Sequence, residues 1–182
     1  MDIQYQLTFF SQWRSDAGAS FGASADNSVV RDADGLPFFP GKALKGLLRE
    51  AVEDYNELTG GKYSDDIAII FGGVGIEGKC HFSDAKFEDN EAKSIVSGHL
   101  QRYLFHSTTT TALDDNGLKR AHSLRTLEAV VPCTLYGTIY NVPDGAEELI
   151  RKSFKFIKYI GMHRNRGFGR CLLEEKGGNE NV

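Results

Sequence analysis

The chain has 182 residues, of which 41% are hydrophobic and 25% are charged, and its formal net charge is -4. This length and composition are typical of one globular domain with a buried core. No run of about 18 apolar residues occurs, and the first stretch, MDIQYQLTFF, lacks the basic residues of a secretory signal, so we expect a cytoplasmic protein with no membrane partner.

The N-terminal part of the sequence predicts a strand, a long loop and a helix. Apolar residues alternate with polar ones from Ile3 to Phe9, which is typical of a half-buried strand. A loop rich in Ser, Ala, Gly and Asp follows over about residues 11–39, and its length favours a functional role. Apolar residues then recur at helical spacing after Pro40, and the pair of glycines that begins with Gly60 ends this helix.

The middle of the chain predicts two strands separated by an insertion. A short apolar stretch around Phe82 suggests the second strand, and a polar, irregular insertion follows over about residues 88–126. Alternating apolar residues from Leu127 to Ile139 predict one long third strand. Pro132 inside it implies an edge strand or a bulge.

The C-terminal part predicts a helix, a basic turn and a last strand. Asp144 is the expected N-cap of the helix, whose basic residues gather toward its end up to Lys158. Cys171 to Leu173 form the last strand, and residues 177–182 are expected to be a flexible tail.

These elements predict an α+β, ferredoxin-like fold. Without the insertions their order is strand, helix, strand, strand, helix, strand, which RNA-recognition domains share. We expect a single domain over residues 1–176, with a long loop after the first strand and an insertion before the third.

Two further patterns do not indicate a cofactor. Residues 73–78, GVGIEG, match the GxGxxG pattern of dinucleotide-binding loops, but the next residues, KCHF, read as a strand where that fingerprint needs a helix. Cys80, Cys133 and Cys171 lie far apart without a CxxC pair, so they predict neither a disulfide framework nor a zinc site. We interpret them as buried, small apolar residues.

Charge is unevenly distributed along the chain. Residues 50–91 contain eleven acidic residues and three lysines, whereas residues 151–170 contain seven basic residues and no acidic one. A basic stretch can bind nucleic acid because each phosphate contact needs a cation. The alternative interpretation is that each charged stretch is only a solvated face.

The first predicted helix carries cations where its dipole disfavours them. Lys42, Lys45 and Arg49 share one face, with both lysines in the first turn. A bound anion would offset this cost, and free backbone N–H groups after Pro40-Gly41 would add donors for a phosphate. A tolerated pair of surface lysines is the alternative interpretation.

The stretch GMHRNRGFGR, residues 161–170, combines glycines with arginines. Glycine lets backbone approach a ribose-phosphate chain closely, and arginine contacts phosphate through two N–H groups at once. A plain turn between helix and strand is the alternative interpretation. The candidate RNA-binding residues of this stretch are Gly161, His163, Arg164, Arg166, Gly167, Gly169 and Arg170.

Other candidate catalytic residues are a loop aspartate and two histidines. Asp26 lies in the long loop between Gly22 and an apolar Val-Val pair, and one carboxylate can hold a Mg²⁺ ion that keeps most of its waters. His106 and His163 could instead support metal-free RNA cleavage by acid–base chemistry.

Residues 29–49, VVRDADGLPFFPGKALKGLLR, resemble the RAMP superfamily of CRISPR-associated proteins. The likeness is strongest to the repeated backbone subunit of type III interference complexes, which has a (Val/Ile)-(Arg/Lys)-Asp run, a turn and Pro-Gly-Ser-Ser-Leu-(Lys/Arg)-Gly. Here Lys-Ala replaces the serine pair, and Met162 and Arg164 stand where that group has further glycines. The other matching stretches are Phe71-Gly72, Phe82-Ser-Asp84-Ala85, Leu127-Glu-Ala-Val-Val-Pro132 and Arg166-Gly-Phe-Gly-Arg170.

The resemblance implies a modified RNA-recognition fold that binds guide RNA through the helix start and the glycine-rich loop. It implies other copies of the chain and other effector subunits as partners, and a thumb formed by the insertion before the third strand. In that group a loop aspartate supports metal-dependent cleavage of paired target RNA, and its position here is Asp26, which would hold Mg²⁺ or another divalent cation.

The resemblance leaves two alternatives open. One is a RAMP-type endoribonuclease that processes precursor guide RNA without a metal through His163 or His106. The other is a catalytically inert, RNA-binding assembly subunit in which Asp26 is only a loop residue.

Overall fold

The computed structural model of the chain describes residues 1–15, 29–110 and 125–177. The α+β class is confirmed, because helices and antiparallel strands alternate along the chain. The elements are β1 (Ile3–Phe9), α1 (Gly41–Leu58), α2 (Ser64–Phe71), β2 (Gly72–Gly73), β3 (Ile76–Glu77), β4 (His81–Phe82), α3 (Asp89–Ser97), the 3-10 helix η1 (Gln101–Leu104), β5 (Phe105–Thr110), β6 (Arg125–Val130), β7 (Thr134–Tyr140), α4 (Glu147–Phe154), the 3-10 helix η2 (Arg164–Arg166) and β8 (Cys171–Glu175).

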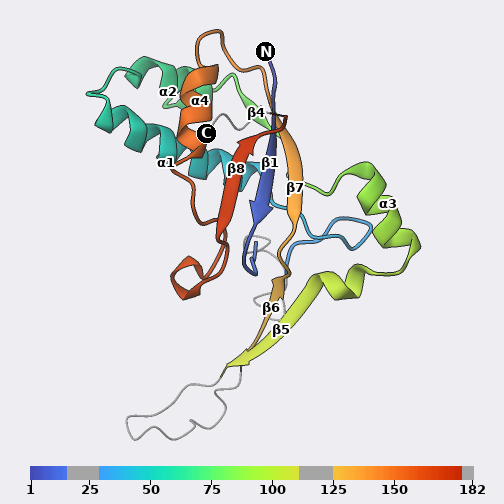
Figure 1. Cartoon of the computed structure of the whole chain (residues 1–182). Helices are drawn as coiled ribbons and strands as arrows, with labels where there is room; N and C mark the ends of the chain where they lie inside the picture. The colour runs from blue at the N-terminus through green and yellow to red at the C-terminus, as the bar shows by residue number, and fades with distance from the viewer. Residues whose placement is uncertain (16–28, 111–124, 178–182) are drawn as a thin grey trace, which may run out of the picture.

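The main sheet has four antiparallel strands in the order β4-β7-β1-β8. Figure 1 shows α1, α2 and α4 together on one side of this sheet, with the β5–β6 hairpin extending away from it. Alternate residues of β1, from Ile3 to Phe9, point into the core between sheet and helices, as the sequence predicts. Among the described residues no helix has both the length and the hydropathy needed to cross a bilayer.

The predicted long third strand is wrong. It is two strands in different sheets, because β6 pairs with β5 whereas β7 pairs with β1 and β4. The break lies around Pro132, which has no N–H to donate to a ladder. The preceding Val131 N–H donates to the carbonyl of Leu104 at 2.9 Å, so the chain leaves the hairpin at this point.

The predicted irregular insertion is also more ordered than its sequence suggested. Between residues 89 and 110 it forms α3, η1 and β5, and Ala92, Ile95 and Val96 of α3 pack partly buried against the core. The sequence analysis missed α2 as well. Residues 73–78 form the β2–β3 hairpin, in agreement with the rejection of a dinucleotide loop.

The start of α4 differs from the prediction. The helix begins at Glu147 after Ala146, and no side chain caps it. Glu147 Oε2 accepts the N–H of Gly145 at 2.8 Å, which fixes the turn before the helix but does not replace the cap expected of Asp144. Lys158 lies beyond the helix end at Phe154.

The Tyr5 side chain of β1 lies over Gly137 of β7, where a larger residue would overlap the Tyr5 ring. Tyr5 OH donates to the carbonyl of Ser83 at 3.0 Å, and a Cβ on Gly137 would lie 2.3 Å from that hydroxyl oxygen. Burial raises the pKa of the Tyr5 phenol well above its usual value. This contact joins β1 to the segment that follows β4.

We predict a specific pH dependence for this contact. Because the folded state keeps the Tyr5 phenol neutral, its contribution is complete below the unfolded pKa of about 10 and is lost as pH rises above it. Tyr5→Phe should cost about 1 kcal/mol at neutral pH through the lost hydrogen bond. Urea unfolding of both proteins at pH 7 and above pH 10 measures this. An equal pH dependence in Tyr5→Phe would contradict the assignment.

Candidate nucleic-acid interface

The first turn of α1 is held against β4 by a glycine and a carboxylate. A Cβ on Gly41 would lie 2.2 Å from the carbonyl oxygen of Phe82 and 2.6 Å from that of Ser83, so only glycine permits this approach. The Gly41 N–H donates to Asp84 Oδ1 at 2.9 Å. The Gly41 N–H is therefore not free for an anion, and Asp84 already supplies a negative charge at the start of this helix.

The three cations of α1 differ in their surroundings. Lys42 is exposed and Lys45 is half-buried, and neither forms an ion pair with any residue that the structure describes. Arg49 Nε lies 2.8 Å from Glu53 Oε1, and Arg49 also donates to the carbonyl of Gly72 at 3.3 Å. The two lysines are available to an anion, whereas the Arg49 guanidinium is already bound to the protein.

Hydrogen bonds fix both ends of the loop at residues 160–170 to the segment that follows β1. The Ser11 hydroxyl oxygen accepts the Arg170 N–H at 2.9 Å. The main-chain bonds are Phe10 N–H to Arg170 O at 2.8 Å, Gly169 N–H to Gln12 O at 2.7 Å and Met162 N–H to Arg14 O at 3.0 Å. The loop is therefore a preformed element whose position follows from β1.

Two of the three glycines in the loop at residues 160–170 are required by close backbone contacts at its ends. A Cβ on Gly161 would lie 2.3 Å from the carbonyl oxygen of Arg14, and one on Gly169 would lie 1.8 Å from that of Ile160. Gly167 has a positive φ of 84° but nothing within 4 Å of an added Cβ. Only Gly167 thus has the open space expected of a glycine that approaches a ligand, while Gly161 and Gly169 are needed by the fold.

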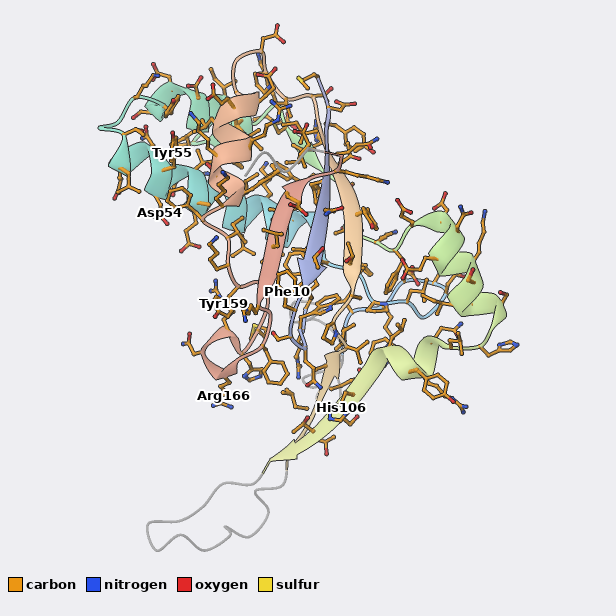
Figure 2. The ribbon with its side chains drawn as sticks, viewed as in Figure 1. Phe10, Asp54, Tyr55, His106, Tyr159 and Arg166 are labelled. Carbon is orange, nitrogen blue, oxygen red and sulfur yellow. The ribbon has the colours of Figure 1, made fainter. Side chains whose placement is uncertain are left out.

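The loop carries three arginines. Arg164, Arg166 and Arg170 are exposed, and none of them forms an ion pair within the described ranges. Figure 2 shows Arg166 at the outer end of the loop. His163 adopts a left-handed conformation with φ of 61°, and its ring centroid lies 6.2 Å from that of Phe168. These cations are placed to meet an anion from solvent.

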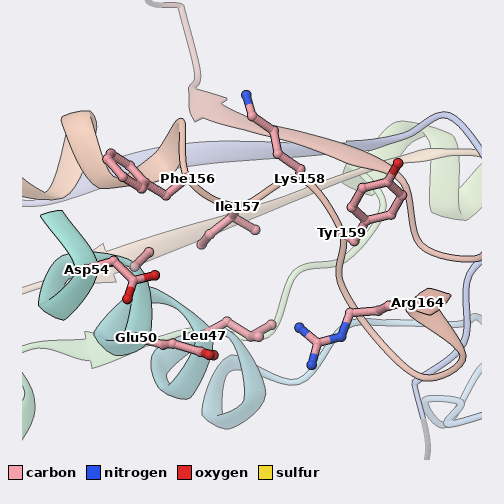
Figure 3. Close-up of a pocket in the computed structure, with 9 residues that line it drawn as sticks. Leu47, Glu50, Asp54, Phe156, Ile157, Lys158, Tyr159 and Arg164 are labelled. Carbon is pink, nitrogen blue, oxygen red and sulfur yellow. The ribbon is translucent and has the colours of Figure 1, made fainter.

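The structure does not gather all predicted RNA-binding residues on one patch. Arg164 meets α1 beside Leu47 in a groove that Figure 3 shows in close-up. Lys45 and Arg49 are each two residues from Leu47, which is about 200° around a helix and hence the opposite flank. The loop and the flank with Lys45 and Arg49 are therefore two separate basic features.

Asp26, the predicted catalytic and metal-binding residue, lies outside the described residues. The chain on its two sides is held together, because the Val30 N–H donates to the Ser15 carbonyl at 3.1 Å. Trp13 and Val130 exchange two main-chain hydrogen bonds of 3.0 and 2.8 Å. Both flanks of residues 16–28 are thus attached next to the base of the β5–β6 hairpin.

Glu128 of β6 completes this attachment, and the sequence analysis missed its role. Its carboxylate accepts the Val29 N–H at 3.2 Å and Arg31 NH2 at 2.6 Å. The Arg31 guanidinium also lies 3.8 Å from the Phe105 ring centroid. Glu128 and Arg31 both lie in stretches that resemble the family motif, but only the fold shows that they pair.

The two candidate histidines lie on separate elements. His106 is exposed on β5 opposite Ala129, and His163 precedes η2. Neither imidazole hydrogen-bonds to a residue of the described chain. Nothing in the surroundings therefore orients either ring as a general base.

The cysteines behave as apolar residues. Burial raises the pKa of Cys80 to about 11 and that of Cys133 and Cys171 to about 12, so all three thiols stay protonated near neutral pH. Within residues 1–15, 29–110 and 125–177 no group of three or more His, Cys, Asp or Glu side chains could hold a metal ion.

The open face of the sheet gives little room for base stacking. Tyr136 lies on this face opposite Gln6, and Lys176 Nζ lies 4.8 Å from its ring centroid. Lys176 is in turn paired with Glu88. Single-stranded RNA stacks on free aromatic rings of a sheet in many RNA-recognition domains, but here the ring is half-buried and Lys176 lies over it. The loop at residues 160–170 is the better candidate surface.

Comparison with known proteins gives consistent matches. The model of the RAMP superfamily matches residues 8–172. A curated relative, "CRISPR system Cms endoribonuclease Csm3" from Streptococcus thermophilus, is 28% identical over 183 residues, which cover 88% of this chain and 80% of that protein.

Solved structures share the fold. A chain of the type III-B Cmr-beta complex bound to cognate target RNA superposes with a TM-score of 0.65 at 20% identity over 96% of this chain. The present chain spans only 58% of the length of that match. A chain of the apo Cmr-beta complex superposes with a TM-score of 0.73 at 10% identity and covers 98% of both chains.

We predict that the loop glycines differ in their tolerance of substitution. Gly169→Ala should destabilise the protein by about 3 kcal/mol, because its Cβ would overlap the Ile160 carbonyl oxygen in addition to the backbone strain. Gly167→Ala should cost only about 1 kcal/mol, from its positive φ alone. Urea unfolding of both variants tests this, and equal losses would refute the packing argument.

Proposed function

The chain belongs to the RAMP superfamily, and from this premise we propose that it is a backbone subunit of a type III CRISPR effector complex. It binds guide RNA and, in the assembled complex, cleaves the paired target RNA with a divalent cation at Asp26. The name of the curated relative, an endoribonuclease of a CRISPR system, supports this proposal. The likeness of fold to chains of type III-B complexes supports it further.

The observation that carries the RNA-binding part is a set of exposed arginines on a loop with fixed ends. Arg164, Arg166 and Arg170 have no acidic partner among the described residues, and hydrogen bonds to residues 10–14 hold the loop in place. Guanidinium groups bind phosphate bidentately. A preformed loop loses little conformational entropy on binding, so more of the contact energy is retained.

The net charge of -4 is compatible with this role because charge is separated in space. Within the basic stretch Arg151 pairs with Glu175 and Lys152 with Glu148, so the remaining free cations lie near the loop. An acidic flank of six residues lies on α1 and α2: Glu50, Glu53, Asp54, Glu57, Asp65 and Asp66. In our proposal this acidic flank faces the basic side of a neighbouring copy, which makes other copies and other effector subunits partners.

The fold order supports the ferredoxin-like description. The order β4-β7-β1-β8, with α1 after the first of these strands in the chain and α4 before the last, is the arrangement expected of that fold. The projecting β5–β6 hairpin corresponds in our proposal to the thumb of the insertion before the third strand.

For cleavage we propose that Asp26 holds a Mg²⁺ or similar cation. When bound, such an ion supplies Lewis acidity and orients phosphate oxygens of the substrate. The carboxylate of Glu128 fixes the chain at Val29 and Arg31, which follow Asp26 in the sequence. Lys42 and Lys45 would meet phosphates of the guide at the start of α1.

We predict that the loop arginines set RNA affinity. Replacing Arg164, Arg166 and Arg170 together by glutamine should weaken binding of single-stranded RNA by the purified protein about tenfold or more and reduce the salt slope by about 2. The matched control replaces Lys62, Lys79 and Lys93, exposed residues elsewhere, by glutamine. Fluorescence anisotropy over a range of salt concentrations measures both. Equal effects of the two triple variants would reject this RNA surface.

We predict that Asp26 is required for cleavage but not for binding. In the complex purified with its partner subunits and RNA, Asp26→Ala should lower the rate of target cleavage by about a hundredfold or more, and EDTA should abolish it. Guide RNA should be retained. Cleavage that resists EDTA but is lost in His163→Ala or His106→Ala would establish the metal-free endoribonuclease instead. RNA binding without any cleavage would establish the inert assembly subunit.

A further inference from the structure

A groove separates α1 from the segment that leads into the arginine loop. It has a volume of about 230 Å³ and opens between Leu47, Glu50 and Asp54 on the helix and residues 156–164 on the other side. Figure 3 shows these two walls and the Arg164 side chain, which extends from the loop toward Leu47 and Glu50. None of these residues belongs to the phosphate contacts proposed above except Arg164.

The helix wall of the groove is acidic. Glu50 and Asp54 lie four residues apart and so on one flank of α1, where like charges repel each other by a few tenths of a kcal/mol. Both are exposed, and neither pairs with a basic residue within the described part of the chain. Arg164 lines the same groove without forming an ion pair with either carboxylate. The groove thus contains two carboxylates that can accept hydrogen bonds and a guanidinium that can donate them, and these groups are not paired with one another.

The opposite wall carries two aromatic side chains beside Ile157 and Lys158. Tyr159 is 46% exposed and Phe156 is 39% exposed, although large apolar side chains near a groove usually bury themselves. Phe156 also packs edge-on against Tyr55, with ring centroids 5.7 Å apart, which fixes this part of the wall. An exposed ring beside a cationic loop is a typical stacking surface for a base of single-stranded nucleic acid.

The two walls together define the chemistry of the occupant. Along α1 the two carboxylates disfavour a phosphate, whereas Lys158 and Arg164 on the other wall can contact phosphates that flank the occupant. A flat group with N–H donors on its edge would stack on Tyr159 and donate to Glu50 or Asp54. The volume lies below the range of about 300–1,000 Å³ for sites of drug-sized ligands, so it suits a single base.

We propose that this groove holds one unstacked base of the RNA bound by the loop and selects bases that carry an exocyclic amino group. Cytosine presents its N4 amino group to a carboxylate, whereas uracil presents a carbonyl oxygen at the same position and is repelled. Arg164 and Arg166 hold the flanking phosphates while the base turns toward α1. This assignment rests on the proposed RNA binding and adds a preference that phosphate contacts cannot supply.

Cytosine and uracil make the sharpest test because they differ little in size. We expect the purified protein to bind a single-stranded oligocytidylate of about twelve nucleotides about five- to tenfold more tightly than an oligouridylate of equal length. In Glu50→Gln/Asp54→Asn the ratio should fall to about one, because amide groups can donate to the uracil carbonyl as well as accept. Fluorescence anisotropy at constant salt measures the ratio.

Glu57→Gln is the matched control, since Glu57 is another exposed acid of α1 that does not line the groove. Removing an acid outside the groove should raise affinity for both RNAs alike through its charge alone, so the ratio, and not the affinity, reports the groove. Because Glu50 and Asp54 are exposed, their variants should fold, and circular dichroism checks this.

The outcomes are distinguishable. If the wild type binds neither RNA, the proposed RNA binding itself is wrong. If it binds both RNAs equally, or if the double variant keeps the wild-type ratio, RNA binding stands and the base site is rejected. If the double variant keeps the ratio but loses self-association in sedimentation velocity, the groove receives a basic side chain of a second copy, which also overturns the base site.

Discussion

The hydrogen bonds between residues 10–14 and the loop at residues 160–170 determine where the basic surface stands. They extend the pairing of β1 with β8 beyond the end of the regular sheet, so the loop is positioned by the central strand of the fold. Gly161 and Gly169 make this possible because any side chain there would overlap a carbonyl oxygen. A loop built in this way can hold several like charges close together, since its geometry does not depend on contacts between them.

The same segment also reaches the other candidate region. Trp13 pairs with Val130 at the end of β6, and Ser15 accepts the N–H of Val30, so one short stretch contacts the arginine loop, the hairpin and the far side of residues 16–28. Trp13 stacks on Phe9 with centroids 4.4 Å apart, which ties this stretch to the core. The arginine loop, the hairpin and the described residues on both sides of residues 16–28 therefore share one support, and a shift of one would be felt by the others.

Sequence patterns predicted the elements whose apolar period is uninterrupted. β1 and α1 are found where alternation and helical spacing place them. The third strand was wrong because alternation continues across Pro132 although the chain changes sheets there, and a period cannot show which partner a strand has. α3 was missed within a polar stretch, although Ala92, Ile95 and Val96 have helical spacing. The predicted domain boundaries stay a prediction.

For the site, the sequence identified the basic loop but not the partners of individual charges. Asp84 at Gly41 and Glu128 at Arg31 depend on tertiary contacts that no local pattern contains, whereas Glu53 at Arg49 is an i,i+4 pair within α1 that the sequence already offered.

The placement of the glycines separates two kinds of position within a single loop. Residues 165–167 stand in open solvent between anchored ends, so substitutions there alter what the loop contacts without altering how it is held. Residues at the tip can therefore change while the anchored ends stay the same. Related chains can in this way evolve different nucleic-acid preferences on an unchanged scaffold.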